Sequence, residues 1–401
     1  MLSIFCGKSV LADNIVVPTI ALPSGDLAEY RPSKPMELLS GQEAAELDEA
    51  MQSYNANGNT LLINNAKSYY YYDNLDPVAK EIYDVMLGVA QDPVDEGNIG
   101  LMMTDIDPET EEYYKEFNIA YRAICFDHPE LFWLYSGEEA EMYYCSEAVN
   151  YGGFYLVYIR MWQPFVNYEE QMNLFNTATN SFLQEIDLNT SDYEIVRQVH
   201  DKLIELVNYN DPVAEGISPT IIGQDLAHTA YGCFVTDSSG NNNYAVCDGY
   251  TLAMEYILQQ CGIDVAFIGG RAGSSDSSAG GHAWNIVKID GLWYELDSTW
   301  NDAGSLEDDL IAGTEEYKYF TEALSDKEYR DKLDHFLFLV STERIRHFVP
   351  GDEYDYVTND QMYQISLVSE SVHIRMNECS DGSDCDSMII ALAPDAMQGY
   401  R

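Results

Sequence analysis

Apolar residues in the first part of the chain recur at helical spacing, with one strand-like interruption. Asp76 and Pro77 are residue types typical of a helix N-cap and first turn. The apolar positions that follow share one helix face and are Val78, Ile82, Val85, Met86 and Val89. We predict further helices over 111–124 and 169–186, and a strand over 154–161, which is rich in tyrosine and β-branched residues. We therefore expect residues 13–188 to form a mainly helical N-terminal domain.

A second domain is predicted to begin near residue 189. Ser191 and Glu194 match a capping box. The helix after them carries Val196, Val199, Leu203, Leu206 and Val207 on one face. From there to residue 350 the predicted order is helix, loop, helix and then strands, which indicates an α+β domain. Residues 351–401 are acidic and lack periodicity, so we expect an irregular, poorly packed tail.

The pattern around Cys247 predicts a cysteine at the start of a helix. Leu252, Tyr256 and Ile257 share one face, and Gly262 is a typical C-terminal stop. Free backbone N–H groups and the helix dipole favour a thiolate at the N-terminus of such a helix. A thiolate is the nucleophile of thiol-based acyl chemistry. The alternative is an inert buried cysteine.

Residues 281–297 predict a β-hairpin that presents a histidine beside an aspartate. Asp290 and Gly291 separate two strand-like runs and favour a two-residue turn. This turn places Trp284 opposite Asp297, so His282 and Asp297 are diagonal neighbours on one sheet face. Diagonal Cβ atoms lie about 7 Å apart, within reach of an imidazole–carboxylate hydrogen bond. Such a pair can act as a base toward a nearby thiol, and we expect His282 to lie close to Cys247.

The segments AVCDGYTLAMEYILQQCGI and GGHAWNIVKIDGLWYELDSTWND together resemble the transglutaminase-like superfamily. The resemblance covers about residues 190–350 and implies a papain-like fold with a transglutaminase core. It implies that Cys247 is the nucleophile, His282 the general base and Asp297 the acid that orients the imidazole. We further consider Tyr231 and Trp284 as residues that support the site. Tyr231 is a candidate for a second oxyanion donor beside the Cys247 N–H.

These residues predict thiol-dependent acyl chemistry on protein or peptide amides, with no cofactor and no metal. Cysteine-type peptide hydrolysis is the first expectation. Transfer of glutamine to an amine, as in a protein-glutamine γ-glutamyltransferase, is the alternative within the same chemistry, because either water or an amine can resolve a thioester. A non-catalytic surface binding module on the same fold is the alternative from another class.

The charge of the chain limits the classes of partner that it can bind. Lys and Arg number 20 against 68 Asp and Glu, for a formal charge of −48. Such a field repels phosphate backbones and anionic lipid, so we expect no nucleic-acid partner, whereas cationic substrates are attracted. No apolar run approaches the roughly 18 residues of a membrane span.

The N-terminus and the remaining cysteines and histidines give weaker signals. Residues 1–12 resemble a signal-peptide remnant, and with the acidic charge they predict an extracellular or cell-surface protein, with a cytoplasmic location as the alternative. Cys379 and Cys385 lie close enough in sequence to pair. His228, His335, His347 and His373 have no partner evident in the sequence, so we expect them to be structural.

Overall fold

The structure is a computed structural model of the 401-residue chain. It describes residues 3–6, 69–91, 98–135, 142–151, 154–161, 168–214, 226–235, 243–304, 314–359, 364–378 and 389–400. Backbone contacts divide the chain into two units, which are described separately. The first holds residues 1–66, 72–125 and 133–168, and the second holds 67–71, 126–132 and 169–401.

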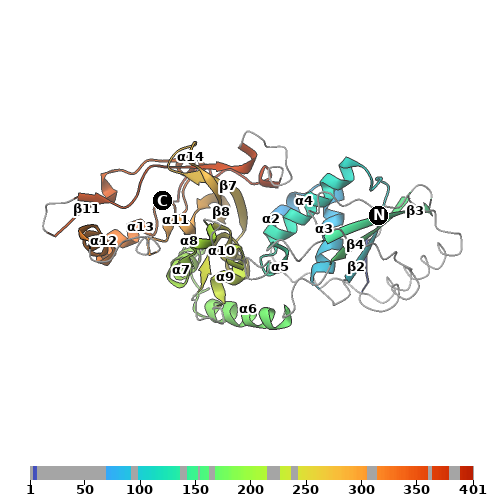
Figure 1. The fold of residues 1–401 in the computed structure, drawn as a ribbon, viewed down its shortest axis with the longest axis horizontal. Helices are drawn as coiled ribbons and strands as arrows, with labels where there is room; N and C mark the ends of the chain where they lie inside the picture. Colours follow the sequence, from blue (N-terminus) through green and yellow to red (C-terminus); the bar gives the residue numbers. More distant parts are fainter. Residues whose placement is uncertain are drawn as a thin grey trace. The chain divides into compact units, whose positions relative to one another are not determined.

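The first unit combines helices with an antiparallel sheet in the order β1-β2-β4-β3 (Figure 1). Its elements are β1 Ser3–Cys6, α3 Pro77–Gln91, β2 Asn98–Thr104, α4 Glu111–Asp127, α5 Phe132–Tyr135, β3 Met142–Tyr151 and β4 Phe154–Met161, with α2 Tyr70–Asn74 at its edge. The predicted helices beginning at residues 77 and 111 and the strand 154–161 are confirmed. The predicted domain is mainly helical with one strand, and the structure adds a sheet to it: a lone strand leaves backbone groups unpaired, and β2 and β3 supply the partners of β4.

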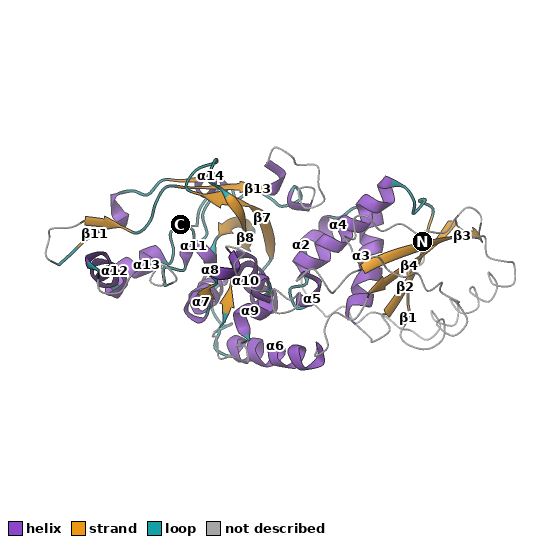
Figure 2. Ribbon diagram, in the orientation of Figure 1, coloured by secondary structure: helices purple, strands orange, loops and turns teal. Residues whose placement is uncertain are grey.

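The second unit is built around an antiparallel five-stranded sheet in the order β10-β13-β7-β8-β9 (Figure 2). Its strands are β7 Val265–Gly273, β8 Gly280–Ile289, β9 Leu292–Leu296, β10 His347–Phe348 and β13 Ser371–Arg375. Helix α10, Cys247–Cys261, packs against β7 and β8. This unit is therefore α+β, as predicted.

Further helices and short strands complete the second unit. They are α6 Tyr168–Leu183, α7 Asp192–Leu206, β5 Asn208–Tyr209, α8 Asp211–Ala214, α9 Ala230–Phe234, β6 Tyr244–Ala245, α11 Ser298–Asn301, α12 Glu315–Ser325, α13 Lys327–Leu333, α14 Thr342–Arg346, β11 Asp355–Val357 and β12 Gln364–Ser366. Helices α7 and α9 pack on α10. The predicted cap of α7 is confirmed, since the Ser191 side chain accepts a hydrogen bond from the Glu194 amide.

Two expected boundaries differ from the structure. Helix α6 belongs to the second unit, because Phe175 packs on Tyr231 and Phe182 on Phe234. The boundary therefore lies near residue 168 and not 188. The expected tail is not wholly irregular, because β13 pairs along β7, more than 90 residues earlier in the chain. Cys379 and Cys385 lie outside the described residues. Ser3–Cys6, within the expected signal-peptide remnant, forms strand β1.

The hairpin of β8 and β9 has the predicted register. Ile289 opposes Leu292, and the ladder continues to Asn285 opposite Leu296. Asp290 and Gly291 both have positive φ, 51° and 81°, as a type I′ turn requires. The ladder ends one residue before Asp297, where the chain turns into α11.

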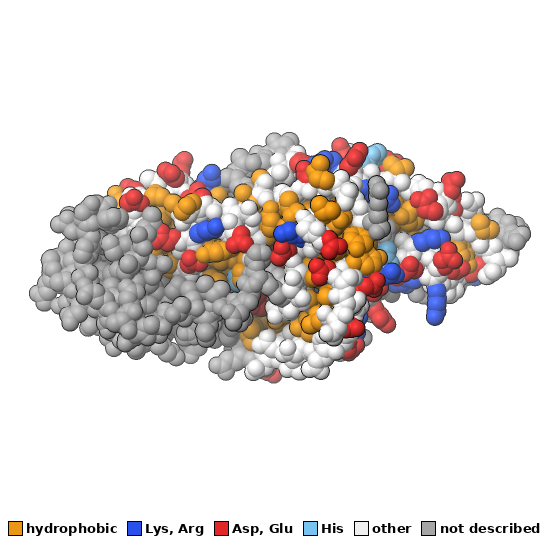
Figure 3. Space-filling view, turned by 180° about the vertical axis from the view of Figure 1, so that it is seen from behind, with side chains coloured by type: hydrophobic (Ala, Val, Ile, Leu, Met, Phe, Trp, Pro, Cys, Tyr) orange, Lys and Arg blue, Asp and Glu red, His pale blue; other side chains and the backbone are white. Residues whose placement is uncertain are grey.

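Acidic side chains are interspersed with basic and apolar ones on the face shown in Figure 3. Among the helices that the structure describes, none combines the length and apolar character of a membrane span.

Candidate active site

Cys247 is the first residue of α10, as the sequence predicts. Gly249 permits the tight approach of this helix start to its surroundings, because an added Cβ would lie 2.5 Å from the Ala227 carbonyl oxygen and 2.9 Å from Ala245 Cβ. The backbone amide of Ala283, which follows His282, donates a hydrogen bond to the thiol. The helix start therefore holds the sulfur against strand β8, at the residue that follows His282.

The thiol environment differs from the expected one. Burial raises the pKa of Cys247 well above its ordinary value, and the Asp248 carboxylate raises it further. Cys247 Sγ donates a hydrogen bond to Asp248 Oδ1 over 3.1 Å. Burial and a neighbouring negative charge therefore oppose the thiolate that the helix N-terminus favours.

His282 and Asp297 form the predicted hydrogen bond. His282 Nε2 lies 2.7 Å from Asp297 Oδ2. Asp297 is also the N-cap of α11, and its Oδ1 accepts from the Trp300 amide over 3.0 Å. Burial alone would raise the pKa of Asp297, but the two histidines beside it, His282 and His373, hold it well below its usual range. An ionised Asp297 makes Nε2 the protonated nitrogen of His282, so Nδ1 is the basic one.

A second histidine contacts the same carboxylate. His373 Nε2 lies 2.9 Å from Asp297 Oδ2, and its side chain is fully buried. We expected no partner for it. The missed signal is the alternation of Val372 and Ile374 with polar residues, which is typical of a short strand. His228, His335 and His347 also have acidic partners, respectively Asp248, Asp201 and Glu370.

Trp284 stacks on His282, and its indole N–H belongs to a buried polar network. Its ring centroid is 5.9 Å from that of His282. Its indole nitrogen donates to Glu295 Oε2 over 2.8 Å. Glu295 also accepts bonds from Thr342 and Arg375, and all four residues are buried. Because Arg375 lies on β13, this network fastens β13 to the hairpin strands.

Tyr231 lies elsewhere. Its ring packs against Phe132 and Phe175, with centroids 4.8 and 6.4 Å away, in an aromatic cluster behind α10. Tyr209 is a tyrosine that does lie near the thiol. Burial raises the pKa of its phenol, and the adjacent Cys247 adds to that effect. The structure thus brings together His282, Asp297 and Trp284, and it places Cys247 against Ala283, the residue after His282, whereas Tyr231 lies elsewhere.

A cavity of about 380 Å³ adjoins His282. Its apolar lining is Trp300, Ala303, Leu333, Phe336, Leu367 and Val368, and its polar lining includes Tyr209, Asp211, Thr299, Asp302 and Ser369. Asp302 is fixed by the Tyr250 hydroxyl, which donates to its Oδ2 over 2.8 Å. No lysine or arginine is among the described residues that line it. The cavity therefore combines apolar walls with two carboxylates, and His282 lines it as well.

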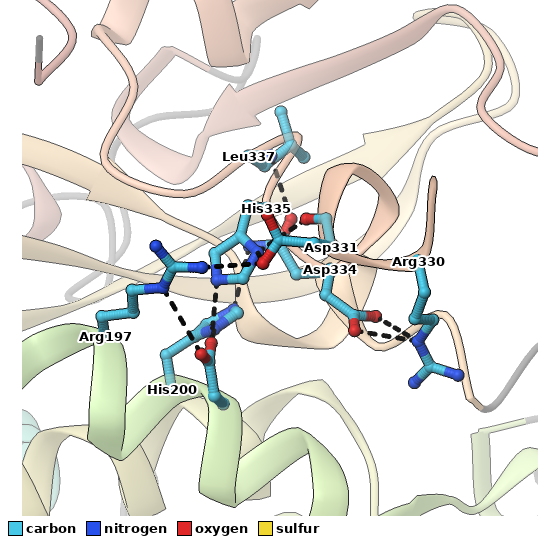
Figure 4. A network of polar contacts seen from close by, with 9 residues as sticks. Arg197, His200, Arg330, Asp331, Asp334, His335 and Leu337 are labelled. Carbon is cyan, nitrogen blue, oxygen red and sulfur yellow. Dashed lines mark hydrogen bonds and ion pairs between the residues drawn. The ribbon is translucent and has the colours of Figure 1, made fainter. Parts of the chain in front are cut away.

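Two groups of described residues have donor atoms close enough to hold a metal ion: His282, Asp297 and His373, and His200, Asp201 and His335. In the first group, two imidazoles already bond the carboxylate. The second group is shown in Figure 4.

In this second group, His200 Nδ1 and His335 Nε2 lie 2.9 and 2.8 Å from Asp201 Oδ1. The Arg197 guanidinium lies 3.5 Å from the other oxygen of Asp201. Asn301 donates to His200 Nε2 over 3.1 Å. The ring nitrogens and the carboxylate are therefore satisfied within the protein, and the cluster ties α7 to the segment after α13.

Comparisons with known proteins give limited similarity. No protein-family model matches the chain, and no curated protein matches it. A crystal structure of a TGase has 11% identity and a TM-score of 0.24 over 54% of this chain and 52% of its own. A "Putative Cysteine Protease from Cytophaga hutchinsonii" has 14% identity and a TM-score of 0.22 over 40% of this chain and 62% of its own.

Proposed function

We propose that this chain is a thiol-dependent enzyme that cleaves protein or peptide amides through a thioester on Cys247. The observation that carries the proposal is the 2.7 Å contact between His282 Nε2 and the buried Asp297 carboxylate, next to a cysteine at a helix start. A histidine oriented in this way by an acid is the base that thiol and hydroxyl nucleophiles require.

The site supports a general-base mechanism from a neutral thiol. The Cys247 proton passes to His282 Nδ1 as sulfur attacks the amide carbon, and Asp297 stabilises the resulting imidazolium. Nδ1 then gives this proton to the leaving amine, which leaves a thioester. Water, deprotonated by the same nitrogen, attacks the thioester and releases the acid and the thiol. The Cys247 backbone N–H at the start of α10 is an oxyanion donor, and Tyr209 replaces Tyr231 as the candidate for a second donor.

Transamidation is the second candidate, and the cavity beside His282 favours it. Its apolar walls suit the aliphatic stem of a lysine side chain, and Asp211 and Asp302 suit the ammonium group. In this reaction the amine, after losing a proton to His282, takes the place of water at the thioester.

Incubation with a glutamine-containing peptide and a labelled primary amine tests both reactions, with products read by mass spectrometry. Peptide cleavage supports hydrolysis, and a mass gain equal to the amine minus ammonia supports transamidation. Both must disappear in Cys247→Ser, while Cys233→Ser, which alters a buried thiol in α9, serves as the matched control. A wild-type chain that yields neither product over a varied peptide library, and whose Cys247 resists alkylation, is a binding module instead.

A further inference from the structure

Asp297 accepts three hydrogen bonds, and one donor comes from a segment outside the motif. Oδ1 accepts from the Trp300 amide, while Oδ2 accepts from both His282 and His373. Because both imidazole contacts reach one oxygen of an acceptor-only carboxylate, each histidine presents its Nε2–H to it. The acid is therefore held by two histidines from different strands.

His373 can reach this position because strand β7, which lies between β13 and β8, carries small side chains here. His373 on β13 opposes Ala272 on β7, and Gly270, two residues earlier, opposes His282 on β8. A Cβ at Gly270 would lie 2.8 Å from Trp284 Cη2. Without side-chain bulk on β7, groups from β8 and β13 meet above it. Accordingly, the His373 ring lies 5.2 Å from that of Trp284.

The His373 ring is packed among other aromatic rings. Its ring centroid is 4.8 Å from that of Trp300 and 5.5 Å from that of His282. Burial lowers its pKa, although the hydrogen-bonded Asp297 carboxylate acts in the opposite direction. The bond from its Nε2–H to Oδ2 orients the Asp297 carboxylate toward His282. Arg375 lies two residues after His373 on β13, and its ion pair with Glu295 on β9, two residues before Asp297, holds the two segments in this register.

We propose that His373 is a positioning residue of the active site, which holds the Asp297 carboxylate ionised and oriented toward His282. The expected effect on catalysis rests on the proposed function, whereas the orientation of Asp297 by His373 does not. The C-terminal segment then contributes a residue to the site, because His373 lies beyond the residues that carry the motif.

Two substitutions separate this role from simple packing. His373→Leu keeps most of the volume and removes the donor, whereas His373→Gln retains an N–H near the position of Nε2. We expect His373→Leu to lower kcat about tenfold with KM within twofold, and to move the acidic limb of the pH profile upward. His373→Gln should recover most of kcat. His347→Leu, which removes an exposed histidine on the neighbouring strand β10, is the matched control and should behave as wild type.

A second measurement does not depend on turnover. The Asp297 carboxyl titration, followed by carbon NMR, should shift upward by about 1 pH unit in His373→Leu and stay near wild type in His373→Gln. An unchanged titration and unchanged kcat in His373→Leu would overturn the inference. Equal losses in both variants with a collapsed melting temperature would assign His373 to packing alone, and one equivalent of metal bound by wild type but not by His373→Leu would assign it to a metal site. An inactive wild type with the expected titrations would refute only the proposed function.

Discussion

Replacing Asp248 with asparagine should make the Cys247 thiol more reactive. Asp248 Oδ1 accepts a hydrogen bond from the Cys247 thiol over 3.1 Å, and Oδ2 lies 3.0 Å from His228 Nδ1. The negative charge therefore lies directly beside the sulfur and opposes its ionisation. Asparagine keeps the size of the side chain and removes the charge, so the thiolate becomes easier to form.

The structure sets the size of this effect. A hydrogen bond to a charged group contributes about 1.5–3 kcal/mol, and a thiol is a weak donor, so the lower figure applies. The Asp248 side chain is 21% exposed, so solvent screens it incompletely. Since about 1.4 kcal/mol corresponds to a factor of ten, the thiolate population at pH 7 should rise roughly tenfold.

The rate of alkylation by iodoacetamide between pH 6 and 9 measures this population. Asp248→Asn should react about tenfold faster at pH 7, with adducts mapped to Cys247 by mass spectrometry. Glu370→Gln is the matched control, because it removes one acid from an exposed acid–histidine pair on another part of the unit. An alkylation profile identical to wild type would show that Asp248 does not control the thiol.

Three further substitutions test other parts of the structure. Asp297→Asn should lower kcat by a factor on the order of 10³–10⁴ with a folded chain, because an amide nitrogen in place of Oδ2 misorients His282; wild-type turnover would refute the role. Burial raises the pKa of Glu255 well above its ordinary value, and Asp127 adds to this. The contribution of Glu255 to the stability of the fold is therefore fully present below about pH 4.3 and is lost as the pH rises through its pKa in the folded state. Glu255→Gln should raise the melting temperature at pH 8 relative to wild type more than at pH 4, and an equal effect at both would contradict this. Gly270→Ala should destabilise the chain by about 3 kcal/mol in denaturant titrations, because a Cβ would collide with the Ile374 carbonyl and the Trp284 ring; an unchanged midpoint would contradict it.

Local sequence signals predicted the parts of the site that lie within one helix or one hairpin. Cys247 at a helix start follows from apolar spacing and Gly262, whose φ of 93° ends α10. The His282–Asp297 contact follows from the turn at Asp290 and Gly291, which fixes the register of two strands at short range. In each case the interacting groups are set by backbone geometry within about twenty residues.

The parts that depend on distant pairing were not predicted. The donor from His373 requires β13 to pair with β7, about 100 residues earlier, and no local pattern specifies that register. Tyr231 was misplaced for a similar reason, since the rings around it come from residues 132 and 175. The burial of the Cys247 sulfur beside Asp248, which opposes the expected thiolate, was not predicted, because the pattern of a helix start does not reveal it.

The central claim is that Cys247 carries the acyl group, and acid-quench mass spectrometry tests it most directly. The protein is mixed with a cleavable or glutamine-containing peptide substrate, quenched in acid within the first turnovers and mapped by peptide mass. The account predicts an acyl adduct on Cys247 and on no other cysteine, absent from both Cys247→Ser and Asp297→Asn. Product formation without that adduct, or its persistence in Cys247→Ser, would contradict it.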